Sequence, residues 1–491
     1  MTRPTVRPID RHACAALVAA LFAVGACGSD RGVPSTVKGS IEGGVTGPGA
    51  CYVNANAAAP SDGAAVITID ASQKFQTMQG FGTSARVFDD PHVTETFDQS
   101  TKRAAAIPPE SQQNQILDAL YYDLGLSRVR MLTADLGGVE PVNDNADPQV
   151  ADLSKFDFSW KQGDAQIDLV KNIAKRGPMT FYSSTWSLEK WMTESNPEEY
   201  AEWVMVTLRR WRDKGVEMPY FSLKNEPGYA PSGGLWSGEY LRQVTKILGA
   251  RIKAEGMKTK LVVPDDVTPS EAYSRLQIIL ADPDARQYIG AIGYHVYQRG
   301  GEDKIKQLGE QYGIPIWMTE YSTPDNWLDW AMLTHELITQ DGVSAVDYMW
   351  GFFGDWDKSQ LIALVVSNGA YQRFRLTPQY YAMGQYSRFV RPGAVRVAAT
   401  SSDPNVKASA YVDGYKLIIV ATYVGSGGTG IAFERRVRFE LGSSGPCVRR
   451  ADAVRTSDSD SWLPLATTTV DVPRFSASLP ARSVTTFVGQ Q

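Results

Sequence analysis

The sequence is poor in cysteine and histidine. Its 491 residues include only 4 Cys and 4 His. The four histidines, His12, His92, His295 and His335, lack the spacing of metal ligands, and no glycine-rich phosphate loop follows a predicted strand. We therefore expect neither a metal nor a nucleotide cofactor.

An excess of one charge is also absent. The chain has 49 Lys+Arg against 54 Asp+Glu, a net charge of −5, and no polybasic run. A nucleic-acid or anionic-lipid partner would need such a run, so both kinds of binding protein are disfavoured. The adjacent Asp265 and Asp266 fit a helix cap or a substrate contact better than a cation site. No stretch beyond residue 26 approaches the length of a membrane-spanning helix.

The N-terminus has the pattern of an export signal. Three arginines precede the apolar stretch ACAALVAALFAVGA at residues 13–26, which is too short to span a bilayer and predicts a signal peptide over 1–26. The following Cys27 completes a sequence that resembles the bacterial lipobox, although an ordinary cleavage site stays open. We expect an exported bacterial protein, either secreted or held at the cell envelope, that touches the membrane only through this lipid.

Two cysteines remain once Cys27 carries lipid and the signal peptide is removed. An oxidising compartment permits Cys51 and Cys447 to form a disulfide. Sequence alone does not give the distance between them, so a paired and a free state both stay open.

The rest of the chain divides by composition. Residues 27–64 are rich in Gly, Ser, Ala and Pro and predict a flexible tether. Residues 65–76 alternate as a strand, residues 77–388 alternate strand-like with helix-like segments, and residues 389–491 contain short strands between Gly-rich turns. The strand candidates of the middle part are 79–82, 126–132, 178–184, 220–226, 260–266, 289–297, 315–321 and 345–352. Eight such units predict a (β/α)8 barrel, and the outer parts predict an antiparallel β-sandwich built from both chain ends.

Two of the predicted barrel strands finish in a carboxylate. YFSLKNE ends at Glu226 before Pro227, and PIWMTEY carries Glu320 near its end. Barrel active sites lie at the C-terminal ends of the strands, and two carboxylates facing one cleft are what cleavage of a glycosidic bond requires. A single strand-end Glu can equally be structural or a metal ligand; it is the pair that favours a glycosidase. A non-catalytic carbohydrate-binding lipoprotein on a degenerate barrel is the alternative outside enzymes.

Three motifs resemble glycoside hydrolase family 30, a family of clan A that includes bacterial xylanases and glucosylceramidases. They are Lys224-Asn225-Glu226-Pro227, Trp317-Met318-Thr319-Glu320 and the run YYAMGQYSRFVRPGAVRV at 380–397. The similarity extends from about Val66 to the C-terminus. It implies a retaining hydrolase in which Glu226 is the general acid/base and Glu320 the nucleophile, with carboxyl groups roughly 5–5.5 Å apart.

The resemblance also implies roles for residues around this pair. Arg128 matches a strand-end arginine that hydrogen-bonds the nucleophile, although an ion pair across the bottom of the barrel is the alternative. Tyr297 matches a tyrosine that touches the nucleophile. His295 lies on the same strand face, and we favour substrate contact over a core role for it.

Four further residues match sugar-contacting positions of the family. Asn225 matches the residue that holds the sugar 2-hydroxyl. Trp186 and Trp350 match tryptophans after the third and eighth strands, and either could instead plug the barrel end. Asp135 matches a hydroxyl-binding acid, although an Asp at a loop start is often a cap.

Specificity is where the sequence departs from one subgroup. Glucuronoxylan-specific members carry paired arginines after the eighth strand, whereas this chain has Asp355, Asp357 and Lys358 there. We therefore do not expect glucuronate recognition. An endo-β-1,4-xylanase acting as a monomer on polysaccharide is the first prediction. An exo-acting glucosylceramidase- or β-glucosidase-like enzyme, or a β-1,6-glucanase or galactanase, is the alternative.

Overall fold

The computed structural model describes residues 63–89, 106–132, 140, 142–157, 163–186, 188–189, 191–229, 235–323, 326–425, 434–471 and 473–491. All of them belong to one compact unit, Thr46–Gln491. The predicted signal peptide and nearly all of the predicted tether lie outside the described residues, as do Cys27, Cys51 and Asp135. None of the helices in the described ranges is both long and apolar enough to cross a membrane.

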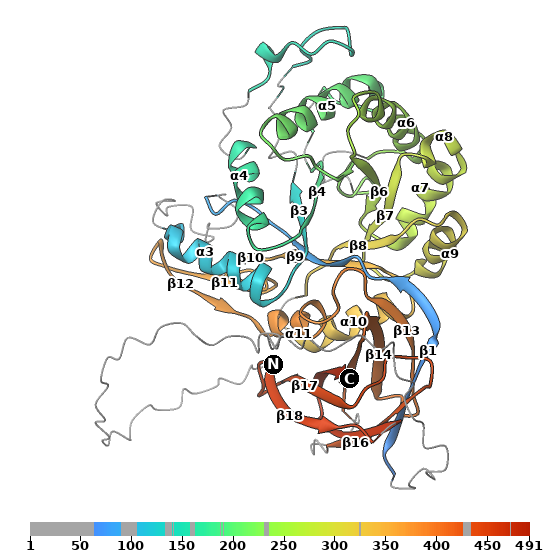
Figure 1. The fold of residues 1–491 in the computed structure, drawn as a ribbon. Helices are drawn as coiled ribbons and strands as arrows, with labels where there is room; N and C mark the ends of the chain where they lie inside the picture. The colour runs from blue at the N-terminus through green and yellow to red at the C-terminus, as the bar shows by residue number, and fades with distance from the viewer. Residues whose placement is uncertain are drawn as a thin grey trace, which may run out of the picture. The chain divides into compact units, whose positions relative to one another are not determined.

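Eight parallel strands close into the predicted barrel, and each lies within or close to a predicted segment (Figure 1). They are β2 (Gly80–Ser84), β3 (Arg128–Leu132), β4 (Thr180–Ser184), β5 (Tyr220–Ser222), β6 (Lys260–Asp266), β7 (Ile289–His295), β8 (Ile316–Glu320) and β9 (Ala345–Trp350). Pairing of β2 with β9 closes the ring. The barrel part of the fold prediction is therefore confirmed.

Amphipathic helices surround the barrel (Figure 1). They are α3 (Glu110–Asp118), which continues into a π-helical turn η1 (Ala119–Asp123), α4 (Gly163–Ala174), α5 (Pro197–Asp213), α6 (Gly238–Ala254), α7 (Pro269–Ala281), the short α8 (Pro283–Arg286), α9 (Glu302–Tyr312) and α10 (Trp327–Thr339). In α6, Ser237 caps the first turn by accepting from the backbone N–H of Tyr240. Leu241, Val244 and Leu248 recur at helical spacing and are buried, which fixes the face that packs inward.

Strand β5 is shorter than the sequence predicted. Its hydrogen-bond ladder ends at Ser222, four residues before Glu226, so Pro227 does not terminate it. The backbone N–H groups beyond the strand find other acceptors: Asn225 donates to the carbonyl of Thr185 (2.7 Å) and Glu226 to that of Asp265 (2.9 Å). These bonds carry the chain across the top of the barrel instead of continuing the ladder.

The segment after β9 forms a small sheet that the sequence analysis did not predict. The single strand expected at 345–352 divides, and β10 (Phe352–Gly354) pairs in parallel with β11 (Ile362–Ser367), which pairs antiparallel with β12 (Ala370–Leu376). Asn368 and Gly369, both with positive φ, form the two-residue turn between the last two strands. Asn-Gly is a strong hairpin signal, so this hairpin was predictable.

The chain ends build one nine-stranded sheet. Its strands are β1 (Ala65–Thr77), β13 (Val395–Ser401), β14 (Val406–Asp413), β15 (Lys416–Tyr423), β16 (Arg435–Leu441), β17 (Arg450–Ser457), β18 (Leu463–Thr469), β19 (Arg474–Leu479) and β20 (Ser483–Gln490). The order is β18-β17-β20-β15-β14-β13-β1-β16-β19. The prediction of an antiparallel arrangement was wrong at one place, because β1 pairs in parallel with β16 and makes the sheet mixed.

This sheet folds over itself into two layers. Phe439 of β16 and Phe475 of β19 contact Phe487 of β20, with ring centroids 4.8 and 5.7 Å apart, although β20 is far from both in the strand order. The predicted sandwich and the contribution of β1 to it are confirmed. Cys447, in the loop before β17, is disulfide-bonded, and its partner lies outside the described residues.

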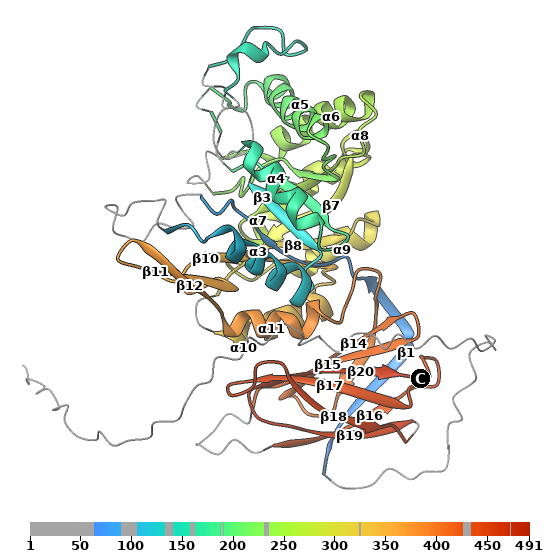
Figure 2. The same ribbon diagram turned by 60° about the vertical axis from the view of Figure 1, so that its left-hand side comes forward.

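Helix α11 (Pro378–Ser387) and helix α10 lie between the barrel and this sheet (Figures 1 and 2). Gln385 of α11 donates to the hydroxyl of Thr456 (2.8 Å) and accepts from the hydroxyl of Thr486 (2.7 Å). These buried bonds join α11 to strands β17 and β20. The sandwich is therefore joined to the barrel domain through α11.

Candidate active site

Two buried carboxylates converge at the C-terminal ends of β5 and β8. Glu226 follows β5 and is 8% exposed, and Glu320 is the last residue of β8 and is 3% exposed. One oxygen of each and a ring nitrogen of His295 all lie within 4.8 Å of one another. This agrees with the separation of roughly 5–5.5 Å that a retaining glycosidase needs. The predicted convergence is present, although the catalytic roles themselves stay predictions.

The backbone beneath the pair is strained. Glu226 has φ 51° and Asp265 has φ 64°, a left-handed conformation that costs a non-glycine residue about 1 kcal/mol or more. Strain of this kind persists only where the surroundings enforce it, and here the Glu226 N–H donates to the Asp265 carbonyl. This hydrogen bond therefore stabilises the left-handed conformation of both residues. As a result, the Glu226 side chain points toward Glu320 and does not continue strand β5.

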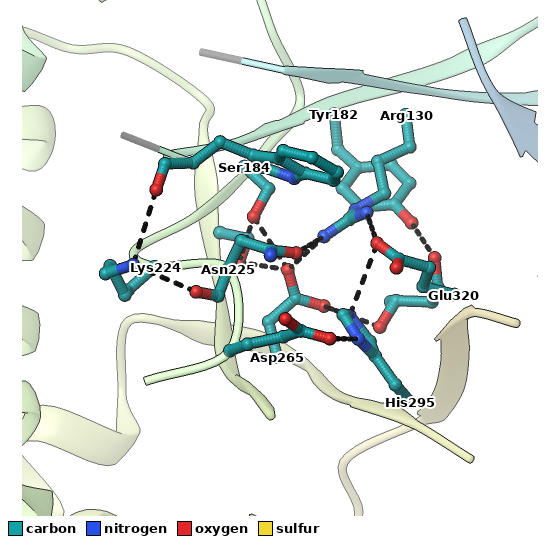
Figure 3. A network of polar contacts seen from close by, with 12 residues as sticks. Arg130, Tyr182, Ser184, Lys224, Asn225, Asp265, His295 and Glu320 are labelled. Carbon is teal, nitrogen blue, oxygen red and sulfur yellow. Dashed lines mark hydrogen bonds and ion pairs between the residues drawn. The ribbon is translucent and has the colours of Figure 1, made fainter. Parts of the chain in front are cut away.

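The arginine that contacts Glu320 is Arg130, so the prediction for Arg128 was wrong (Figure 3). Arg130 is fully buried and donates through Nη1 to Glu320 Oε2. Its Nη2 donates to Asn225 Oδ1 (2.6 Å) and to Asp265 Oδ2 (3.0 Å). One guanidinium thus holds three side chains that come from three different strand ends.

Arg128 instead forms the alternative that the sequence analysis left open, a structural ion pair. Its Nε lies 2.9 Å from Asp347 Oδ1, and its guanidinium lies 3.9 Å from the centre of the Trp317 ring. Alternate residues of a strand share a face, so Arg128 and Arg130 both point into the barrel but at different heights. Arg128 is the first residue of β3 and lies toward the N-terminal end, away from the site.

Asp265 is the hub of the cluster, which the sequence analysis did not predict. It is fully buried at the end of β6, and its carboxylate accepts from Ser184 (2.8 Å), Ser222 (2.7 Å), Thr319 (2.5 Å) and Arg130. Burial opposes its ionisation, but the Arg130 charge and these bonds hold the pKa of Asp265 well below its usual range. It therefore orients Arg130 as a permanent anion and is not a helix cap. Its place at the end of a barrel strand was the available signal.

His295 lies between three carboxylates. It is fully buried at the end of β7, with Nδ1 3.1 Å from Glu226 Oε1. Its Nε2 lies 3.5 Å from Asp265 and 3.9 Å from Glu320, which are charge contacts rather than well-formed hydrogen bonds. Burial disfavours the imidazolium, but the carboxylates, Glu320 foremost, raise the pKa of His295 to about 10. The ring is thus a cation at neutral pH and donates to Glu226.

Tyr297 completes the hydrogen bonding of Glu320. Its hydroxyl donates to Glu320 Oε1 (2.8 Å), while Arg130 donates to Oε2. Burial and the adjacent Glu320 charge raise the pKa of Tyr297, so the phenol stays a neutral donor. Tyr297 is 43% exposed, so one edge of it faces the opening of the site. Both oxygens of Glu320 therefore have donors that favour its ionised form.

Asn225 and the two predicted tryptophans border this cluster. Asn225 is 2% exposed, and its side-chain oxygen is held by Arg130. Trp186 and Trp350 are both partly buried, and the guanidinium of Arg86 lies 5.5 Å from each ring centre. Arg86, two residues after the end of β2, was missed because a single Arg after a short apolar strand carries no motif. The Arg86 guanidinium lies over the Trp186 ring and the Trp350 ring and contacts both of them.

The cluster is a poor metal site although Glu226, His295 and Glu320 have the necessary proximity. A metal would need an unprotonated imidazole nitrogen, whereas His295 is protonated at neutral pH. Glu320 is already neutralised by Arg130. The donor set fits proton transfer and nucleophilic attack better than metal binding.

The barrel and its paired carboxylates define a retaining glycoside hydrolase. Residues 102–402 match the family model described as Glycosyl hydrolase family 59. This match covers more than half of the chain, so the chain belongs to the glycoside hydrolase family that this model describes. The resemblance to glycoside hydrolase family 30 agrees with it, because solved family 30 xylanases share the fold of this chain.

Three similar proteins illustrate the range of relatives. Glucuronoxylanase XynC of Bacillus subtilis (strain 168) is 26% identical over 66% of this chain and 76% of its own length. The lysosomal acid glucosylceramidase of Mus musculus is 20% identical over 69% of this chain and 73% of its own. The crystal structure of a family 30 subfamily 8 xylanase from Clostridium acetobutylicum, 24% identical, covers 87% of this chain and 99% of its own, with a TM-score of 0.67.

Proposed function

We propose that this hydrolase cleaves a β-linked polysaccharide as an endo-β-1,4-xylanase, with Glu226 as acid/base and Glu320 as nucleophile. The observation that carries the mechanism is the spacing of the two carboxylates, because one oxygen of each lies within 4.8 Å of one oxygen of the other. An inverting enzyme needs roughly 6.5–9.5 Å to admit a water between them, and this site is too narrow for that.

In the first step, Glu320 attacks the anomeric carbon while Glu226 gives its proton to the leaving glycosidic oxygen. The C–O bond breaks, and the sugar remains as an ester of Glu320. Arg130 and Tyr297 keep Glu320 ionised before attack, because each donates to one of its oxygens. Asn225, held by Arg130, is placed to accept from or donate to the 2-hydroxyl as charge develops on the ring.

In the second step, Glu226 is a carboxylate and removes a proton from water, whose oxygen attacks the anomeric carbon and releases Glu320. The imidazolium of His295 supports this half of the cycle, because its Nδ1 lies 3.1 Å from Glu226 and favours the charged form. Glu226 is then protonated again and the configuration at the anomeric carbon is retained.

The choice of xylan rests on the 26% identical Bacillus subtilis relative and on the sequence motifs. Glucuronate recognition is not part of the proposal. In the described loop between β10 and β11, the charged side chains are Asp355, Asp357 and Lys358, and no arginine pair is available to bind a carboxylate there. Unbranched or arabinose-bearing xylan remains the fitting substrate.

A panel of substrates tests this choice. Wild-type protein is incubated with xylan, β-1,6-glucan, β-1,6-galactan and an aryl β-glucoside, and the products are sized by chromatography. Mixed xylo-oligosaccharides support an endo-xylanase, whereas release of monomer from the aryl glucoside alone supports the exo-acting alternative. Glu320→Ala serves as the inactive control, and equal activity of this variant would remove the mechanism.

We also propose that the enzyme is exported and held at the cell envelope by lipid on Cys27, and that it acts as a monomer. The support is the apolar stretch at 13–26 followed by a small-residue sequence that ends in Cys. Cell fractionation of wild type and Cys27→Ala tests the anchor, because only the variant should be released in soluble form. Size-exclusion chromatography of the released form tests the monomer.

A further inference from the structure

A second cluster of carboxylates lies outside the active site. Glu140 and Asp144 come from the segment between β3 and α4, and Glu199 and Glu202 lie three residues apart in the first turns of α5 (Figure 1). One oxygen each of Asp144, Glu199 and Glu202 lie within 4.8 Å of one another. Glu140 accepts from the Asp144 N–H (2.9 Å), which brings it against the same group.

Two members of this cluster are buried, unlike the residues of an ordinary acidic surface, and the other two are partly exposed. Glu140 is 2% exposed and Glu202 is 5% exposed. The Oε1 of Glu202 and the Oδ1 of Asp144 are both buried and have no hydrogen-bond partner. Burying an unpartnered carboxylate oxygen is costly, so two such oxygens within one cluster of carboxylates indicate that a ligand belongs there.

Within the described ranges, no Lys or Arg forms an ion pair with any of these four carboxylates. Two arginines of α5 and α6 have other partners: Arg251 pairs with Glu198, and Arg210 with Asp164. In the described part of the chain, the protein therefore supplies no ion-pair partner to this cluster.

We propose that Glu140, Asp144, Glu199 and Glu202 bind one calcium ion. The donors are all oxygens, which excludes a preference for zinc or copper and suits a hard cation. Two oxygens on opposite sides of a calcium ion are separated by about twice a Ca–O distance of roughly 2.3–2.6 Å. The carboxylate oxygens of Asp144, Glu199 and Glu202, which lie within 4.8 Å of one another, have the spacing of such ligands. Calcium also accepts the irregular geometry that a loop and a helix together provide, whereas magnesium requires a near-ideal octahedron.

The proposed ion would connect two segments that border the active site. Glu140 and Asp144 belong to the long segment after β3, and α5 follows the loop after β4, which carries Trp186. The indole of Trp191, in this second loop, already donates to the Glu140 carbonyl (2.6 Å). Calcium would add a charged link between the segment after β3 and α5, close to that bond. This site was not predictable from the order of residues, because the two pairs of acids are 55 or more residues apart.

Calcium titration tests the site without reference to glycosidase activity, so its failure is distinct from failure of the proposed function. The mature protein is stripped with EDTA, dialysed into metal-free buffer and titrated with CaCl2 by calorimetry. We expect one calcium per chain, a rise in Tm of several degrees on saturation, and weaker binding of MgCl2. Absence of binding at millimolar CaCl2 would overturn the proposal.

Substitution locates the binding. Glu202→Gln and Asp144→Asn each remove one ligand charge and should weaken calcium binding by about tenfold or more, with a smaller rise in Tm. Glu310→Gln, an exposed substitution on α9, is the matched control and should bind as wild type does. If Glu202→Gln does not fold by circular dichroism, Asp144→Asn on its partly exposed loop carries the test. Unchanged affinity in the folded variants would place the ion elsewhere and refute the site.

Discussion

The His295 Nδ1 lies 3.1 Å from Glu226 Oε1, so a buried imidazolium donates to the proposed acid/base. A general acid must hold a proton in the first step, and a neighbouring cation favours loss of that proton. The same contact helps the second step, in which Glu226 removes a proton from water. His295 therefore disfavours the protonated acid of the first step and favours the carboxylate of the second step. Its Nε2 also lies 3.9 Å from Glu320 Oε2.

Removing this cation should shift the pH profile of activity. In His295→Gln, the proposed acid/base Glu226 loses a positive neighbour that favours loss of its proton. The basic limb of kcat/KM reports loss of the proton from the general acid, so this limb should move to higher pH, by about one unit. The measurement is kcat/KM on the best substrate of the panel between pH 4 and 9.

His335→Gln is the matched control for this experiment. His335 is also largely buried, on α10, but burial and the charges of Lys407 and Arg396 lower its pKa to about 4, so it is neutral over all but the acidic end of the assay range. Its replacement should leave both limbs in place. If kcat/KM of His295→Gln falls at every pH but its pH dependence does not shift, His295 positions Glu226 and its charge does not tune the acid.

The same histidine makes stability depend on pH. The pKa of His295 is raised from 6.5 to about 10 in the folded protein. A group with a raised folded pKa contributes stability that is fully present below its unfolded pKa and is lost as pH rises through the folded value. Between about pH 6.5 and 10, the Tm of wild type should therefore fall more steeply than that of His295→Gln. Parallel curves for the two proteins, measured by differential scanning fluorimetry, would contradict a protonated His295.

The proposed roles of Glu226 and Glu320 can be distinguished with substrates whose leaving groups differ in their need for a proton. Glu226→Ala should lose about 10²–10⁴-fold in kcat on a polysaccharide, because the leaving oxygen needs a proton. On a dinitrophenyl glycoside, which leaves without one, it should still form the ester of Glu320 and release a burst of one dinitrophenol per enzyme. Glu320→Ala should show no burst on either substrate, since the ester cannot form. A burst from Glu320→Ala in stopped-flow measurements would exclude it as nucleophile.

The two carboxylates of the site could be predicted from the sequence, whereas the hydrogen-bond network between them could not. Hydrophobic strands that finish in Glu226 and Glu320 are visible from residue order, because parallel barrel strands present their ends on one face. The hub at Asp265 is not visible in this way. Its importance depends on donors from β3, β4, the end of β5 and β8, which come together only when the barrel closes.

The error at Arg128 has a geometric origin. Residues 128 and 130 share a strand face, so the alternation of a strand does not distinguish them. The difference is height along the strand, and this depends on where β3 begins, which is at Arg128 itself. Prediction of strand boundaries is the weak step, as the early end of β5 at Ser222 also shows.

The two arginines should give opposite phenotypes. Arg130→Lys cannot reach Glu320, Asn225 and Asp265 at once, so kcat should fall by about 10²-fold while binding of a product oligosaccharide changes little. Arg128→Met leaves Asp347 charged and unpaired in the barrel interior, which should lower the free energy of unfolding by about 3–5 kcal/mol with kcat retained. Urea denaturation and steady-state kinetics measure the two effects. Arg128→Met with Asp347→Leu should recover part of the lost stability, because no buried charge is then left alone. If Arg128→Met loses kcat at a temperature where it is folded, Arg128 contributes to catalysis and the structural assignment is wrong.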